Sequence, residues 1–356
     1  TGGGEESNPG PSPFRGPDDK AKQVAINTMA WYRDRLFLAA GDILFTSRLG
    51  DFDNFWIDDP SNIVSSDPID LRLSSNKYSP IQSMIPFNDF LFINTSGDTQ
   101  FELIGSENQI TPFTAEIAPT TFYSTISTIE PQLLGNQIYF FDESRLYIYF
   151  GQEQTNINQA VDVSTHCPGY LPKNIEKVAT SPSHSSIFFT DKDNPNHIYS
   201  YVNRFSGSEV IQNAFFRFVL DSSVSIKDII TFDNYLYMIN RLGTSLYLQR
   251  LPLSITDETI SNPILDNHVY SSTTGVSRSY NGEDDTTDFI LPFECNSIDT
   301  AIVTSGSNAG WIYSVTAGDG PEDDTTKVSI IGNVDDSELL FGTNYTSTIH
   351  FSEQFV

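Results

Sequence analysis

Five aromatic hairpin segments recur along this chain at nearly constant spacing. In each, an aliphatic-aromatic step stands among alternating apolar and polar residues, the pattern of a short strand, a turn and a second strand. The steps are Leu36-Phe37, Leu91-Phe92, Ile138-Tyr139, Ile187-Phe188 and Leu236-Tyr237, within residues 33–47, 87–105, 134–151, 183–202 and 232–251. Successive steps lie 55, 47, 49 and 49 residues apart. A unit that recurs at a fixed period dictates a whole architecture.

A further strand is predicted just upstream of each hairpin, so that one repeat holds three strands with room for a fourth. These upstream strands are expected at residues 24–30, 81–85, 126–129, 175–180 and 226–231. Four-stranded units of about fifty residues are typical of β-propeller blades. A solenoid would need shorter coils, and a sandwich would not keep this spacing. We therefore predict a β-propeller over residues 21–252.

The regions on either side of the repeats differ from them. Residues 1–20 are crowded with Gly and Pro and lack an apolar period, which predicts an extended linker or arm. Residues 253–356 carry 17 acids but only Arg278 and Lys327 as bases. Strands are expected there at residues 289–291, 300–304, 311–315, 327–331 and 345–351. The predicted fold class is all-β, a β-propeller followed by a smaller, acidic, β-sandwich-like distal domain.

Composition excludes several classes of protein. The 356 residues hold 46 acids against 19 bases, a formal net charge of −27, which repels nucleic acid and argues against phosphate-tracking binders. With 26 Phe and 16 Tyr the chain is too aromatic to be a disordered acidic segment. Cys167 and Cys295 are the only cysteines, so no disulfide framework is expected. The sequence contains no run of eighteen apolar residues, so no membrane-spanning segment is predicted.

No catalytic, cofactor-binding or metal-binding residue is predicted, and no cofactor is expected. His166 stands beside Cys167 in THCPGYLP, but adjacent strand residues point to opposite faces, so a structural loop is favoured. Residues 190–197 and 318–324 concentrate oxygen ligands as a calcium loop does. Neither has the full spacing that ends in a bidentate Glu, and Asp, Asn and Pro suit turns without metal.

Several long stretches resemble one known family. They are YRDRLFLAAGDILFTSRLGDFDNFW (32–56), SSDPIDLRLSSNKYSPIQSMIPFNDFLFINTSGDTQFEL (65–103), DVSTHCPGYLP (162–172), YNGEDDTTDFILPF and GTNYTSTIHFSE. These segments are similar to the tail nozzle protein, or tail tubular protein B, of short-tailed podoviruses, and the resemblance covers essentially the whole chain. The family's N-terminal platform part, which lies under the adaptor ring, is expected to be lacking here.

The resemblance implies a structural protein of the virion tail and no enzyme. Such a protein is a homohexameric tube, assembled in the host cytoplasm, that conducts and retains the genome during DNA ejection into the host. The implied partners are its own copies, the tail adaptor ring and the tail fibres, while double-stranded DNA passes without sequence-specific binding. An acidic wall suits this passage, because a basic wall would hold the phosphates.

Asp284, Asp285, Asp323 and Asp324 are the candidate channel-facing acids, because 15 of the 27 net negative charges lie in the final 105 residues. Solvated turns would hold such acids equally well without any function. An alternative function also stays open, a glycan-binding or glycan-degrading β-propeller at the host cell surface, since a glycosidase needs only two carboxylates about 5 to 10 Å apart in a cleft. A ring with a through-channel would favour the conduit, and a closed axial pocket the enzyme.

Overall fold

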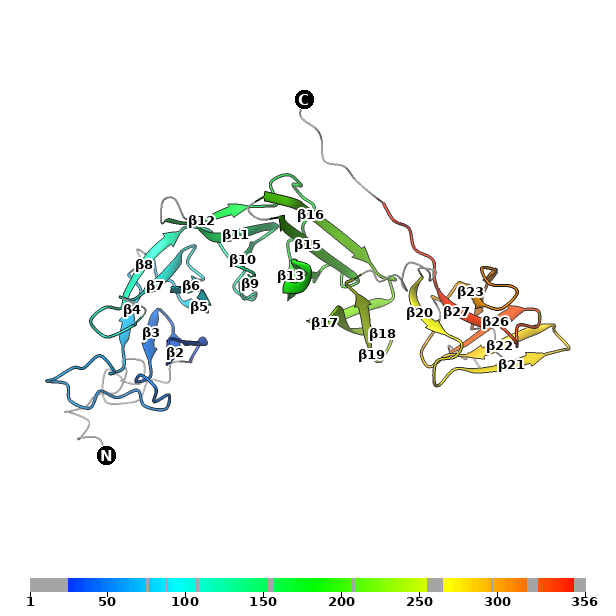
Figure 1. Ribbon diagram of the computed structural model, residues 1–356, viewed down its shortest axis with the longest axis horizontal. Helices are drawn as coiled ribbons and strands as arrows, with labels where there is room; N and C mark the ends of the chain where they lie inside the picture. Colours follow the sequence, from blue (N-terminus) through cyan, green and yellow to red (C-terminus); the bar gives the residue numbers. More distant parts are fainter. Residues whose placement is uncertain are drawn as a thin grey trace, which may run out of the picture. The chain divides into compact units, whose positions relative to one another are not determined.

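The computed structural model describes residues 25–74, 77–87, 89–106, 109–152, 157–206, 209–254, 265–295, 297–318 and 326–348 (Figure 1). Regular structure in these residues is β throughout, apart from the 3₁₀ turn η2 (Pro182–His184). The arm predicted for residues 1–20 lies outside the described residues. The predicted all-β fold class is confirmed.

Over residues 28–252, antiparallel sheets follow one another along the chain, each built from strands consecutive in sequence. The first is β1 (Thr28–Tyr32), β2 (Arg35–Ala40), β3 (Ile43–Thr46) and β4 (Asp70–Arg72). The second is β5 (Ile81–Phe87), β6 (Phe90–Thr95), β7 (Gln100–Ile104) and β8 (Glu116–Thr121). The third is β9 (Gln132–Leu134), β10 (Gln137–Asp142), β11 (Arg145–Gln152) and β12 (Ile157–Asp162). The fourth is β13 (Ile175–Ser181), β14 (Ser186–Asp191), β15 (His197–Ser206) and β16 (Glu209–Val219). A sheet with three described strands follows, β17 (Val224–Phe232), β18 (Tyr235–Leu242) and β19 (Ser245–Pro252).

All five predicted hairpins are therefore confirmed, and four sheets contain the fourth strand for which the repeat left room. One upstream strand was wrong, because residues 126–129 form a turn and the first strand of that sheet is β9. The Ile129 amide donates to Ile126 O at 3.1 Å, and Ile129 is buried in the core. The apolar residues there fill space under a turn, and an apolar pattern alone does not separate that role from a strand.

Two-residue turns set the register of the hairpins. Tyr32 pairs with Arg35, so only Arg33 and Asp34 connect β1 to β2, with φ of 47° and 57°. Positive φ at both central residues gives the turn whose twist matches that of the flanking strands. Asp233 has φ 54° in the corresponding turn between β17 and β18.

The chain divides into two compact units, Thr1–Asp193 with Tyr199–Phe216, and Asn194–Ile198 with Arg217–Val356. We describe each unit by itself. The domain boundaries predicted after residues 20 and 252 stay predictions.

In the first unit, apolar side chains fill the space between successive sheets. Phe37 belongs to the core between the first and second sheets. The rings of Phe92 and Tyr149 are 4.8 Å apart between the second and third, and those of Phe141 and Phe189 are 5.0 Å apart between the third and fourth. First strands lie together, β1 against β5 and β9 against β13, while the last strand β8 lies against β12. Sheets stacked in this way are β-propeller blades.

The second unit contains β17, β18 and β19 and a two-sheet sandwich. One sheet has the order β20 (Asp266–Tyr270), β27 (Glu338–Thr343), β23 (Thr300–Ser305), β24 (Ile312–Ser314). The other has the order β21 (Ser277–Asn281), β22 (Thr286–Ile290), β26 (Lys327–Ile331), β25 (Thr316–Ala317). Phe289 and Phe341, one from each sheet, meet in the core with their rings 4.8 Å apart. This packing is the predicted sandwich.

The predicted strand at residues 345–351 was wrong in its described part. Residues 345–348 carry no regular structure, and the strand of that region is β27. Leu339, Leu340 and Phe341 of β27 are buried, whereas Tyr345 is exposed. Glu338 at its start and a glycine near its end hid this strand in the sequence, because both residue types are depleted in strands.

Candidate functional site

Two of the predicted channel-facing acids, Asp284 and Asp285, lie in the turn between β21 and β22. Asn281 Nδ2 donates to Asp284 Oδ2 at 2.7 Å, and Tyr280 Oη donates to Asp285 Oδ1 at 2.9 Å. Asp285 has φ 49°, a conformation that Asp tolerates in turns. Both residues are exposed, so the turn presents ordered carboxylates to solvent. The other two candidates, Asp323 and Asp324, lie outside the described residues.

A cavity of about 270 Å³ is lined both by Asp284 of this turn and by a base, Lys327. Lys327 Nζ lies 3.0 Å from Asp288 Oδ2, and Ser329 Oγ donates to Asp288 Oδ1 at 2.6 Å. Burial acts to raise the pKa of Asp288, but the Ser329 hydroxyl and then Lys327 outweigh it and leave that pKa below its ordinary value. Lys327 is thus matched by Asp288. Among the described residues, Asp284 and Asp285 have no base at ion-pair distance.

The adjacent His166 and Cys167 lie in the loop between β12 and β13. The His166 ring packs against Phe215 with centroids 5.8 Å apart, while the Cys167 amide donates to Ser164 O at 3.0 Å. Burial, with the nearby charge of Asp162, raises the pKa of the Cys167 thiol to about 11. A thiol is a poor nucleophile when it stays protonated at neutral pH. The loop therefore has a packing role, as the sequence favoured.

The oxygen-rich turn at residues 190–197 uses its oxygens internally. Asn174 Nδ2 donates to Asp193 Oδ2 at 2.6 Å, and the Asp193 amide donates to Asp191 Oδ1 at 2.9 Å. Within the described ranges, no three His, Cys, Asp or Glu side chains gather as a metal site would require. Most of the second such turn, residues 318–324, lies outside the described residues.

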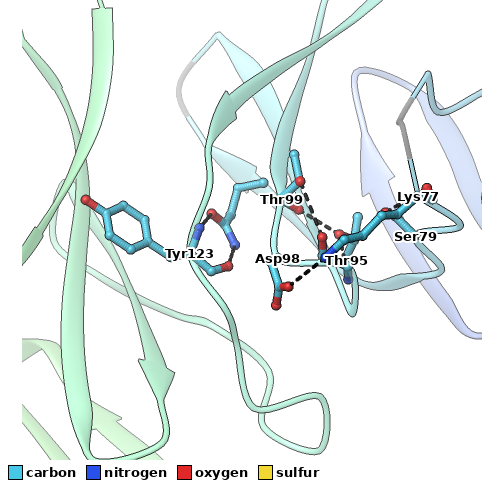
Figure 2. A network of polar contacts seen from close by, with 8 residues as sticks. Lys77, Ser79, Thr95, Asp98, Thr99 and Tyr123 are labelled. Carbon is cyan, nitrogen blue, oxygen red and sulfur yellow. Dashed lines mark hydrogen bonds and ion pairs between the residues drawn. The ribbon is translucent and has the colours of Figure 1, made fainter.

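Figure 2 shows the polar network around the turn between β6 and β7, in the stretch NTSGDTQ. Thr95 Oγ1 donates to Thr99 O at 2.7 Å across the turn, and Lys77 pairs with Asp98 at 3.3 Å. Gln100 Nε2 donates to Tyr123 O at 2.8 Å, while Gln100 Oε1 accepts from the Tyr123 amide at 3.2 Å. The amide side chain thus continues the ladder past the end of β8, as another backbone amide would.

A buried arginine that sequence reasoning missed holds the long loop between β3 and β4, residues 47–69. Arg35 is fully buried, and its guanidinium donates to the carbonyl oxygens of Ser47 at 2.9 Å, Asp67 at 2.8 Å, Ser65 at 2.8 Å and Ile110 at 3.1 Å. Burial lowers its pKa to about 10, which the charge of Asp67 partly opposes. A single base at the start of an apolar strand, followed by a long loop, was the signal available in the sequence.

Loop 47–69 is notable for its exposed apolar side chains. The ring of Phe52 meets that of Trp31 in β1 edge to face at 4.5 Å, and Trp56 is 44% exposed. Leu49 and Met29 are exposed beside them in sequence. Exposed aromatic residues held by a rigid frame are typical of an interaction surface.

Comparison with known proteins gives a whole-chain match. Residues 1–356 match the family described as "Bacteriophage nozzle protein". The tail tubular protein gp12 of Escherichia phage T7 is 24% identical over 232 residues, which are 64% of this chain and 29% of that protein. The matched part is thus less than a third of that relative's length. No helix in the described residues is long and apolar enough to cross a membrane.

Similar solved structures include β-propellers. YCF48 bound to D1 peptide has a TM-score of 0.41 at 9% identity, with 95% of this chain and 96% of that chain covered. The Cps50 (Swd1) β-propeller domain of Myceliophteria thermophila has a TM-score of 0.35 at 12% identity, with 64% and 72% covered. With its blade-like sheets and its match over the full length, this chain belongs to the bacteriophage nozzle protein family.

Proposed function

We propose that this protein is a structural component of a bacteriophage tail nozzle and acts without catalytic turnover. Six copies form a tube that retains the genome and conducts it into the host during ejection. The observation that carries the proposal is the family match along the entire chain. The partners are the other copies, the tail adaptor ring and the tail fibres. The protein assembles in the host cytoplasm and resides in the virion tail.

The charge of the chain supports this role. Each copy carries a formal net charge of −27, so a ring of copies has a strongly negative field. DNA must slide through the tube without sticking, and cationic walls would bind phosphates by releasing counterions. Carboxylates repel the duplex and keep it near the axis. No sequence-specific binding is needed for this passage.

The acids of the distal sandwich are placed by this proposal at the lumen or its exit. Asp284 and Asp285 are exposed on an ordered turn, and no base neutralises them among the described residues. Asp323 and Asp324 join them in the proposal on the basis of the sequence alone. Residues 253–356 then extend the tube beyond the propeller.

Particles assembled without this chain test the proposed function. A phage carrying a nonsense codon in the gene is grown in a host with or without a suppressor tRNA. Without suppression, electron micrographs are expected to show filled heads with a shortened tail, and no DNA enters cells. Suppression restores both. Tails of normal length and normal infectivity in particles that lack the chain would overturn the proposal.

A further inference from the structure

One face of the sheet β17–β18–β19 is apolar and uncovered. Strand alternation and the pairing of Ile230 with Tyr237 and of Ile239 with Leu248 put one set of side chains on the same side. Phe232 and Leu248 are each 71% exposed. We call this side the aliphatic face; it comprises Ile230, Phe232, Ile239, Leu246 and Leu248, with Arg241 and Arg250 among them. The opposite side, with Leu236 and Met238, is buried.

The first sheet has an open surface of similar apolar character. One face of the first sheet packs on the second sheet. The other face carries Leu38 and Phe45, against which Phe55 of loop 47–69 packs. Met29 and Trp31 of β1 stay 67% and 58% exposed on that face. We call Met29, Trp31, Leu49, Phe52 and Trp56 the aromatic surface. Faces of this kind are buried wherever two sheets of the first unit meet.

The two surfaces are complementary in charge. Beside the aromatic surface, loop 47–69 exposes Asp51 and Asp53. The aliphatic face carries two guanidinium groups, those of Arg241 and Arg250, against one carboxylate, that of Asp228, so its charge is net positive. Within the described residues, no carboxylate lies at ion-pair distance from either arginine. Arg250 already stacks over the Tyr235 ring at 4.4 Å. Arg and Trp are the residues that dominate binding at protein interfaces, where they also stack on one another.

We propose that the aliphatic face of one copy packs on the aromatic surface of the next copy, with Arg241 and Arg250 against Asp51 and Asp53. The proposal rests on the ring of the proposed function and identifies the contact that builds it. Two different patches of one chain that fit each other form a head-to-tail interface, which closes into a ring when the rotation between copies allows it. Apolar side chains exposed on both surfaces are removed from water in the contact.

Charge reversal of the full-length protein tests this contact. One variant carries Arg241→Glu and Arg250→Glu, and the other carries Asp51→Lys and Asp53→Lys. Each variant alone is expected to associate at least about tenfold more weakly than the wild type, because like charges then face each other. Analytical ultracentrifugation at tens of micromolar gives the oligomer size. A control with Lys173→Glu and Lys192→Glu, exposed bases that belong to neither surface, has the same charge change as the first variant and is expected to assemble normally.

Mixing the two variants separates a contact between copies from one inside a chain. In an equimolar mixture, reversed arginines meet reversed aspartates and unchanged arginines meet unchanged aspartates, so full-size oligomers of alternating copies are expected. A chain that carries all four changes is also expected to assemble. Recovery in that chain but not in the mixture would overturn the proposal in favour of an intrachain contact.

Two other outcomes would also overturn it. One is a wild-type protein that is monomeric at tens of micromolar. The other is that both single-surface variants assemble like the wild type while their circular dichroism is unchanged. Neither outcome changes the tail phenotype of particles that lack the chain, so the proposed function is judged separately.

Discussion

The hydroxyl of Tyr149 in β11 donates a hydrogen bond to the carboxylate of Glu102 in β7, a strand of the preceding blade. Asn158 of β12 donates to the same oxygen, and Tyr149 Oη lies 3.0 Å from Thr120 Oγ1. Burial raises the pKa of Glu102, although the two donors oppose it. A carboxylate thus lies between two blades, where losing a donor is costly.

Tyr149→Phe is expected to lower the free energy of unfolding by about 2 kcal/mol, because a buried carboxylate loses a donor and nothing replaces it. Urea denaturation at pH 7 measures the change. Tyr123→Phe is the matched control, since its hydroxyl has only a 3.4 Å contact with Ala160 O. Equal effects of the two substitutions would show that the Glu102 contact contributes no stability.

Glu102→Gln is expected to change how stability depends on pH. The folded-state pKa of Glu102 is raised, so its contribution to stability is present below the unfolded-state value of 4.5 and is lost as pH rises through the folded pKa. The stability of the variant relative to the wild type should therefore increase as pH rises above 4.5. Melting temperatures of both proteins from pH 4 to 8 give this difference. A difference that does not vary with pH would contradict it.

Arg35→Met is expected to cost about 3 to 5 kcal/mol, because it removes a donor from each of four carbonyl oxygens and a partner charge from buried Asp67. Arg35→Lys should not restore the loss, since an ammonium group lacks the planar fork that reaches several carbonyls. Denaturant titration of both variants checks this. Loop 47–69 should also become sensitive to protease, and a resistant loop in Arg35→Met would contradict its anchoring role.

Gly97→Ala is expected to destabilise the β6–β7 turn by about 1 to 3 kcal/mol, because a Cβ there would overlap the Ser79 side chain. Ser79→Gly in the same chain should recover most of the loss by opening that space. A double-mutant cycle from thermal unfolding gives the coupling energy. Additive effects would mean that the two residues do not interfere.

Asp→Lys changes at residues 284, 285, 323 and 324 are expected to leave particle assembly intact, because exposed turn charges contribute little stability. Ejection should slow at low salt, since rings of new cations would hold phosphates, and added salt should relieve the defect by screening. Time-resolved DNA release from purified particles measures the rate. Release at the wild-type rate in low salt would remove these residues from the channel.

The hairpins could be predicted from the sequence because their information is local. Alternation such as that around Tyr237 and the turn residues Asp233 and Asn234 fix strands and register within a few positions. Strand β9 pairs locally with β10 but is only three residues long, so the apolar run before it was assigned as the strand instead. Strand β27 lies between β20 and β23, whose residues are far along the chain, so its pairing was not visible locally.

The candidate site was accessible only in part. Charge counts made Asp284 and Asp285 candidates, because acids in turns are visible in composition, and their place in a channel stays a prediction. The roles of Arg35 and Gln100 were not visible, because their partners are backbone carbonyls and amides far along the chain, which leave no trace in residue type. The aromatic surface was likewise hidden, since exposure of Trp31 depends on which side of β1 the loop covers.

The strands that begin and end the sandwich are neighbours: β20 pairs with β27, and Asp266 stands opposite Thr343. The first and last strands of the sandwich therefore lie side by side. A domain connected in this way behaves as an interchangeable module, which recombination can remove, replace or enlarge while the rest of the protein keeps its fold. Variation among members of the family is then expected to be greatest between these two strands.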